Sequence, residues 1–272
     1  KGKDRGRDTG RRKVVKTDDI KSKIKGSIGR EIFFYEKVGS TNTVASNLAE
    51  EVAEGTVIIA DTQEKGRGRL GRVWVSPPGE NIYMSIILQP QIETKDATLI
   101  TIMAAVASAN ALRKTTGLNI SIKWPNDLIC HERKIGGILT ELKTDQKGIL
   151  FSVIGIGINV NTDIDAFPED VREIATSVKN ETGKLFLREE IVAEILNEIH
   201  NWYMILKAMK REVLLAEWQR LTSTLGKEVI VVIGQETYKG FAEAIDDEGM
   251  LILRLPSEEM KRIHSGDVTV LR

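Results

Sequence analysis

The sequence predicts an α/β or α+β main domain followed by a small all-β domain. The chain has 272 residues, which is more than one average domain. Strand-like and helix-like patterns alternate over residues 31–222, as expected of a sheet packed against helices. Residues 223–272 instead form a run of short strand patterns separated by turn signals, and this spacing favours a small barrel.

Strands are predicted where β-branched and aromatic residues gather. In the main region these stretches are residues 32–35, 56–60, 81–88, 120–124, 135–142 and 149–160. In the last region they are residues 228–233, 238–245, 250–255 and 268–271.

Four helices are predicted from apolar residues that recur at helical spacing, over residues 41–53, 96–115, 191–206 and 213–221. Ser40 or Thr41 is the expected N-cap of the first helix. Gly117 is expected to end the second helix, because glycine readily adopts the left-handed conformation of a helix C-terminus.

Residues 1–30 are strongly basic and are predicted to be a tail or a linker. Only Ile20, Ile24 and Ile28 follow a helical spacing there, so a short linker helix is the one element expected. A solvated tail is the simplest interpretation of the charges that precede it.

Composition excludes several classes of function. The formal net charge of +0 argues against general adhesion to nucleic acids or membranes. No apolar run reaches the roughly 18 residues that span a bilayer, and no secretory signal follows the first charges. Cys130 is the only cysteine, so a reducing cytoplasm fits and no intrachain disulfide can form. With one cysteine and three scattered histidines, no zinc cluster is expected.

The most informative segment is a loop rich in glycine and arginine, between two predicted strands. It reads Gly66-Arg67-Gly68-Arg69-Leu70-Gly71-Arg72-Val73-Trp74. Its glycines let the backbone approach a ligand, and its arginines offer charge-assisted donors to carboxylates and phosphates. It lacks the Gly-Lys-Ser/Thr ending of a phosphate-binding P-loop. A mobile basic hairpin that touches nucleic acid is the alternative interpretation.

A second segment, Lys123-Trp124-Pro125-Asn126-Asp127, brings polar side chains to the end of a predicted strand. Polar groups at strand ends often face a site, although Pro-Asn-Asp is also ordinary turn chemistry. Lys134 then begins a strand whose next residues include Gly137, which leaves room for a ligand beside the ammonium group. A solvated lysine is the alternative there.

The last segment is a predicted strand that contains Gly155 and Gly157 and continues to Asn159. Glycine inside a strand usually marks the close approach of a ligand or of another backbone. The Asn159 side chain can both donate and accept toward the edge of a base, while tight sheet packing is the alternative explanation for the glycines.

These segments, in this order, resemble the biotin protein ligase family over about residues 31–272. The match consists of Ser40-Thr41-Asn42, Gln63, the Gly-Arg loop to Trp74, Ser76-Pro77, Asn81 to Ser85, Lys123 to Asp127, Lys134 to Gly137, and Gly157 to Asn159. The resemblance implies an α+β fold, with a mixed sheet and packed helices in a catalytic domain over residues 31–222. An SH3-like barrel over residues 223–272 is implied to follow it.

The resemblance also implies the roles of individual residues. Those implied for biotin binding are Ser40, Thr41, Asn42, Gln63, Gly66, Arg67, Lys134 and Gly137. Those implied for nucleotide binding are Arg69, Arg72, Trp74, Asn126 and Asn159. Those implied for catalysis are Lys134, Arg69, Asp127 and Lys123. No metal-ligating residue is assigned.

The implied reaction forms biotinyl-5′-AMP from biotin and ATP and then transfers biotin to a lysine of a biotin carboxyl carrier protein domain. Bringing a carboxylate to an α-phosphate joins two anions, so Arg and Lys must offset their repulsion, and Mg²⁺ normally shares that task. A homodimer that pairs edge strands of the main sheet is a further expectation.

Two alternative functions stay open at this point. A lipoate–protein ligase has a similar catalytic domain and parallel chemistry. A ligand-sensing transcriptional regulator without catalysis would use the basic residues 1–16. Many members of the family carry a winged-helix DNA-binding domain before the ligase, but residues 1–30 are too short for one. Residues 16–29 resemble the linker that follows such a domain. Because residues 1–30 are too short for the domain itself, DNA is not an expected partner.

Overall fold

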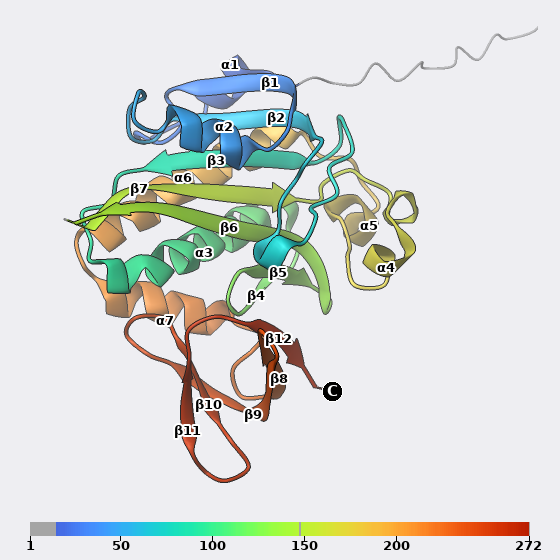
Figure 1. The fold of residues 1–272 in the computed structure, drawn as a ribbon. Helices are drawn as coiled ribbons and strands as arrows, with labels where there is room; N and C mark the ends of the chain where they lie inside the picture. Colours follow the sequence, from blue (N-terminus) through green and yellow to red (C-terminus); the bar gives the residue numbers. More distant parts are fainter. Residues whose placement is uncertain (1–14, 147, 272) are drawn as a thin grey trace, which may run out of the picture.

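The computed structural model describes residues 15–146 and 148–271, so the basic residues 1–14 lie outside the described part. Its main sheet has seven strands in the order β1-β2-β3-β7-β6-β5-β4 (Figure 1). Their bounds are β1 Ile32–Val38, β2 Val57–Gln63, β3 Ile82–Leu88, β4 Ser121–Lys123, β5 Asp127–Cys130, β6 Arg133–Asp145 and β7 Gly148–Ile158. Strands β1 and β2 are parallel and the other neighbours are antiparallel. The expected mixed sheet is confirmed.

Helices cover both faces of this sheet (Figure 1). The long helix α3 (Ala97–Thr116) packs with α6 (Arg188–Lys207) and α7 (Arg211–Leu221) in the larger core. The short helix α2 (Thr41–Leu48) covers the opposite face in a separate cluster. Side chains alternate along a strand, so β2 contributes to the cores on both faces of the sheet. Val57 and Ile59 belong to the larger core, and Ile58 belongs to the smaller one.

A second, antiparallel sheet follows, in the order β11-β10-β9-β8-β12. Its strands are β8 Glu228–Ile233, β9 Glu236–Ile245, β10 Leu251–Arg254, β11 Met260–Ile263 and β12 Asp267–Val270. Buried Trp124 connects this sheet to the main domain: its backbone N–H donates to Thr224 Oγ1 at 2.9 Å and its indole N–H to the Gly249 carbonyl at 3.1 Å. The expected all-β C-terminal part is confirmed, with β11 as an additional strand.

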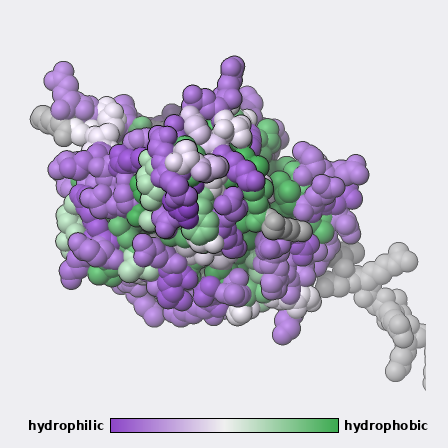
Figure 2. All heavy atoms as spheres, turned by 90° about the horizontal axis from the view of Figure 1, so that it is seen from below, coloured by the Kyte–Doolittle hydropathy of each residue, from purple (hydrophilic) through white to green (hydrophobic). Residues whose placement is uncertain are grey.

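The surface seen from the side of this C-terminal sheet is mainly hydrophilic, with apolar atoms showing between the polar ones (Figure 2). Among the described residues, no helix combines the length and the hydropathy that a membrane crossing requires.

The short linker helix expected within residues 1–30 is present, whereas several other short elements were not predicted. Helix α1 (Thr17–Lys21) lies against α6 with Ile20 fully buried, and the backbone N–H of Lys25 donates to Asn197 Oδ1 at 2.8 Å. Strand β5 has only four residues and follows a Pro-Asn-Asp turn, so its pattern was hidden by the turn. The segment between β7 and α6 contains α4 (Glu169–Arg172) and α5 (Val178–Thr182), which are too short to show a period.

The C-terminal end of α2 differs from expectation. Helix α2 ends at Leu48 rather than at residue 53, because the chain turns back so that the N–H of Gly55 reaches the Ile87 carbonyl at 2.8 Å. Ser40 occupies the N-cap position of α2 but makes no capping hydrogen bond. Gly117 ends α3 in the left-handed conformation, as predicted.

Ser177 does cap its helix, and the contrast with Ser40 gives a test. Ser177 Oγ accepts from the backbone N–H of Asn180 at 3.1 Å at the start of α5. We expect Ser177→Ala to lower the free energy of unfolding by about 1 kcal/mol, the usual contribution of a cap. Ser40→Ala should lower it by less, as measured by urea denaturation of both variants. An equal loss in the two variants would show that capping is not the cause.

Candidate functional site

A single cavity of about 750 Å³ gathers most of the predicted site residues. It lies between the main sheet, the loop of residues 66–74, residues 167–175 and the start of β12. This volume is typical of small-molecule sites. The predicted residues that line it are Ser40, Thr41, Asn42, Gln63, Arg67, Arg69, Arg72, Trp74, Lys123, Asn126, Asp127, Lys134, Gly137 and Asn159.

The loop of residues 66–74 is a tight hairpin. The N–H of Trp74 donates to the Gly66 carbonyl at 2.9 Å, and the N–H of Gly68 donates to the Arg72 carbonyl at 2.7 Å. A Cβ atom on Gly66 would lie 2.3 Å from the Trp74 carbonyl oxygen. Gly66 was expected to contact the ligand, but it is not among the described residues that line the cavity. A contact between Gly66 and the ligand stays a prediction, and the structure adds that Gly66 is needed so that the hairpin can close.

The Trp74 indole lies against Gly137 of β6 and Gly157 of β7. A Cβ atom on Gly157 would come within 2.6 Å of Trp74 Cε2, and one on Gly137 within 3.4 Å of Cζ3. The Lys134 Nζ atom is 5.4 Å from the centroid of the ring. The glycines noted in the sequence therefore make room for an aromatic side chain beside a lysine.

Asp127 holds two lysines at the centre of the cavity. Its Oδ1 atom is 2.6 Å from Lys134 Nζ, and its Oδ2 atom is 3.3 Å from Lys123 Nζ. The β4–β5 turn brings Lys123 and Asp127 into register across the hairpin. One carboxylate between two ammonium groups keeps both cations close without direct repulsion.

Two arginines of the loop reach the same end of the cavity and also meet the C-terminal sheet. Arg69 Nη1 donates to Asn126 Oδ1 at 3.0 Å and to the Gly266 carbonyl at 3.4 Å. Arg72 forms an ion pair with Asp267 at the start of β12. Burial lowers the pKa of Arg69, and the charges of Asp267 and Asp127 act in the opposite direction. The guanidinium stays charged at neutral pH because its ordinary pKa is so high.

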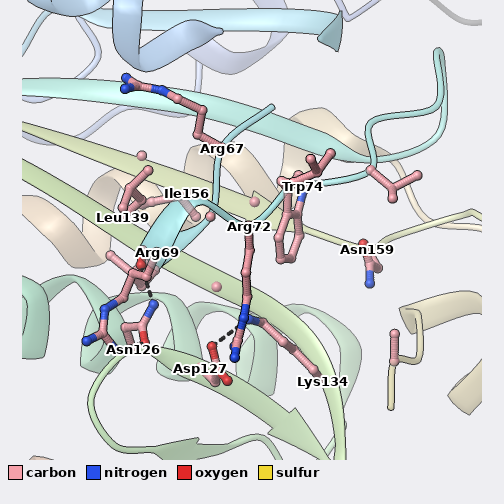
Figure 3. A pocket seen from close by; sticks show the side chains of 18 of the residues that line it. Arg67, Arg69, Arg72, Trp74, Asn126, Asp127, Lys134, Leu139, Ile156 and Asn159 are labelled. Carbon is pink, nitrogen blue, oxygen red and sulfur yellow. Dashed lines mark hydrogen bonds and ion pairs between the residues drawn. The ribbon is translucent and has the colours of Figure 1, made fainter. Parts of the chain in front are cut away.

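The opposite end of the cavity is built from neutral hydrogen-bonding groups. Gln63 Oε1 accepts from the backbone N–H of Thr41 at 2.9 Å and from its hydroxyl at 3.1 Å. Ser85 Oγ, fully buried, donates within this group to Asn42 Oδ1 at 2.6 Å. Arg67 points away from the other two arginines toward this end, where it is paired with Glu141 (Figure 3). A ligand with a polar neutral head and an anionic tail matches the two ends.

Comparison with known proteins shows which family shares this arrangement. The model of the Biotin/lipoate A/B protein ligase family matches residues 34–159, and that of the Biotin protein ligase C terminal domain matches residues 224–271. The bifunctional ligase/repressor BirA of Bacillus spizizenii is 35% identical over 89% of this chain and 74% of its own length. The chain belongs to the biotin protein ligase family.

Further members of the biotin protein ligase family resemble the chain over most of their length. The biotin–[acetyl-CoA-carboxylase] ligase of Paracoccus denitrificans is 33% identical over 81% of this chain and 93% of its own length. A solved structure of the biotin protein ligase from Aquifex aeolicus, in complex with biotin and ATP, superposes with a TM-score of 0.77. It is 30% identical and covers 89% of this chain and 99% of that chain.

Some lining residues of this biotin protein ligase were missed from the sequence. Gly266 and Asp267 come from the C-terminal sheet, which showed no chemical signal beyond an ordinary turn. Ile174 and its neighbours line the cavity from a segment with no clear period. The N–H of Lys134 donates to the Ile174 carbonyl at 2.8 Å, so this segment continues the sheet beside Lys134.

Asn159 lies on the same wall of the cavity, and its carboxamide makes one hydrogen bond within the protein. It is buried, and its Nδ2 atom donates to the Thr176 carbonyl at 3.0 Å. Its backbone N–H donates to the Ile135 carbonyl at 2.8 Å. The side chain is therefore held in one orientation at the cavity wall.

One group of metal-ligand types lies outside the cavity. Cys130, His131 and Glu181 place ligand atoms within 4.8 Å of one another, a grouping that the sequence could not show because Glu181 is far along the chain. Burial raises the pKa of the Cys130 thiol to about 11, so it is protonated at neutral pH. Glu181 already binds Arg133 at 2.8 Å as well as His131 at 2.7 Å. The group fits a hydrogen-bonded anchor between the β5–β6 turn and α5 better than a metal site.

Proposed function

We propose that the chain forms biotinyl-5′-AMP from biotin and MgATP and transfers the biotinyl group to a lysine of a biotin carboxyl carrier protein domain. The observation that carries this proposal is the single cavity with a neutral hydrogen-bonding end and a cationic end. Biotin has a neutral ureido ring at one end and a carboxylate at the other. A ligand of that shape would place its carboxylate among the cations and its ring beside Gln63 and Thr41.

In the first step, an oxygen of the biotin carboxylate attacks the α-phosphorus of ATP. The new bond is a mixed anhydride, the bond from the α-phosphorus to the bridging oxygen breaks, and pyrophosphate leaves. Lys134 and Arg69 offset the repulsion between the two anions, and Arg72 faces the departing pyrophosphate. Mg²⁺ would enter with ATP and would supply positive charge that offsets the charge developing on the phosphates. Asp127 and Asp267, which line this end, already have cationic partners, and Asp170 is a third carboxylate that lines the cavity.

The nucleotide would lie between the loop and the wall of β7. Trp74 offers an aromatic face for the adenine, and Asn159 and Asn126 offer carboxamide groups at the wall. The mixed anhydride hydrolyses readily, so a loop that covers it protects it from water. The hairpin of residues 66–74 is suited to that task because its arginines bind both the wall and the C-terminal sheet.

In the second step, the neutral amine of the carrier lysine attacks the acyl carbon and AMP leaves. Asp127 would orient the amine and take its proton. Val73 and Ile174 line the cavity and are 77% and 63% exposed, so they offer apolar contacts to a carrier domain that docks at its mouth. A cytoplasmic location would fit such a partner, and pairing of two subunits through an edge strand stays a prediction.

The direct test is to incubate the protein with biotin, MgATP and an apo carrier domain and to follow biotinylation by mass spectrometry. We expect a mass gain of one biotinyl group on a single lysine. Lipoate should compete poorly with biotin when pyrophosphate release is measured. Absence of product with an acceptor that a known biotin ligase modifies would contradict the proposal.

Arg69→Ala is expected to weaken retention of the adenylate. The Arg69 guanidinium joins the loop to the wall at Asn126, and a hydrogen bond to a charged group contributes about 1.5–3 kcal/mol. We therefore expect biotinyl-AMP to leave about tenfold faster or more, as measured by release of the labelled adenylate from the purified complex. Arg220→Ala, which removes an ion pair with Glu217 on α7, is the control. Equal release rates from both variants would mean that Arg69 does not hold the adenylate.

A further inference from the structure

Glu141 on β6 connects the two elements that form the neutral end of the cavity. Its Oε2 atom accepts from Arg67 Nη2 at 2.8 Å and from Asn42 Nδ2 at 2.7 Å. Arg67 belongs to the loop of residues 66–74, whereas Asn42 belongs to α2. One carboxylate oxygen therefore joins the loop, the helix and the sheet.

The position of the Glu141 carboxylate is fixed by its hydrogen bond to the buried side chain of Asn42. Asn42 is only 2% exposed, and its Nδ2 atom also donates to the Leu139 carbonyl at 3.2 Å. A Cβ atom on Gly155 would lie 2.3 Å from Asn42 Oδ1, so the glycine of β7 leaves the space that Asn42 occupies. The buried carboxamide thus holds the carboxylate, and the carboxylate holds the arginine.

The charges at the two ends of the cavity differ because of this carboxylate. At the cationic end the cations outnumber the carboxylates even when Asp170, which also lines the cavity, is included: the cations are Lys123, Lys134, Arg69 and Arg72, and the carboxylates are Asp127, Asp267 and Asp170. At the other end the single cation Arg67 is matched by Glu141, and the remaining groups are neutral. The cavity therefore attracts an anion at only one end.

We propose that Glu141 determines the orientation and the specificity of the acid substrate by cancelling the charge of Arg67. An acid can enter the cavity in two directions, and the wrong one puts its carboxylate beside Arg67. Glu141 opposes that direction by like-charge repulsion, yet it leaves the guanidinium free to donate to a neutral carbonyl such as that of a ureido ring. Glu141 is a positioning residue that acts through Arg67, and its assignment rests on the proposed function.

The test compares wild type with Glu141→Gln, which keeps the size of the side chain and removes its charge. We expect kcat for adenylate formation and the KM for biotin to fall together by about tenfold, because a reversed biotin occupies the cavity without reacting, while the KM for ATP changes little. Hexanoate, an acid without a ureido ring, should inhibit the variant about tenfold more strongly, because its carboxylate can now bind Arg67. Glu141→Asp keeps the charge and should restore weak inhibition by hexanoate.

The control variant is Glu50→Gln, which removes the exposed ion pair between Glu50 and Lys143 on the same strand β6. It should leave biotin and hexanoate binding unchanged. Wild-type values of both constants in Glu141→Gln would overturn the inference. If Glu141→Gln does not fold, the double variant Arg67→Gln/Glu141→Gln replaces it, because neither side chain of the pair is then charged. Hexanoate should inhibit the double variant as weakly as it inhibits the wild type. Stronger inhibition of the double variant would overturn the inference. A wild-type protein that forms no biotinyl-AMP would refute the proposed function instead.

Discussion

Lys134→Ala is expected to slow adenylate formation by about 10²–10³-fold, the usual effect of removing one group that stabilises charge in a transition state. The Nζ atom of Lys134 lies 2.6 Å from Asp127 and 5.4 Å from the centre of the Trp74 ring, where a carboxylate and an α-phosphate would meet. Without its charge, the repulsion between the two anions would be offset only by the remaining cations: the arginines, Lys123 and the Mg²⁺ that enters with ATP. Lys123 remains 3.3 Å from Asp127 in the variant, so no carboxylate is left unpaired and the fold should be retained.

The measurement is the rate of pyrophosphate release with biotin and MgATP, together with the midpoint of thermal unfolding. Lys179→Ala is a closely matched control. The Lys179 side chain is 31% exposed, compared with 30% for Lys134, and its carboxylate partner Asp163 lies at 2.7 Å outside the cavity. A similar rate in the two variants would mean that Lys134 does not act on the reacting anions.

Asp127→Asn should separate the two half-reactions. The carboxylate faces both lysines and lines the cavity where the carrier amine would enter. Loss of a general base lowers rates by about 10²–10⁴-fold, so we expect transfer from preformed biotinyl-AMP to a carrier lysine to fall by about that factor. Formation of the adenylate should fall much less, because Lys134 keeps its charge and the asparagine keeps the shape of the side chain.

Single-turnover transfer from synthetic biotinyl-AMP, compared with pyrophosphate release, provides the measurement. The matched control is Asp163→Asn, which removes the partner of Lys179 in the same manner. If both half-reactions of Asp127→Asn fall equally, Asp127 acts by positioning Lys134. If neither falls, the assignment of Asp127 to proton transfer is wrong.

Among the sequence patterns, the glycines within strands gave the most useful prediction of where the site lies. Gly137 was expected to leave room for a ligand, and Gly157 for a ligand or another backbone, whereas the structure shows the Trp74 ring in that room. Gly155 has the same relation to Asn42. Glu141 gave no such signal, because a glutamate in an exposed half of a strand is common and its partners, Arg67 and Asn42, lie far away in the sequence.

The sequence by itself determined the elements with a strong period, their order, and the identity of most charged and hydrogen-bonding side chains that line the cavity. Apolar spacing and cap residues are local, so the long helices and most strands could be predicted from neighbouring residues alone. Only the tertiary structure decided which charges face one another. The pairing of Arg72 with Asp267 and that of Arg67 with Glu141 depend on how distant segments pack against the sheet, and no local pattern encodes that packing.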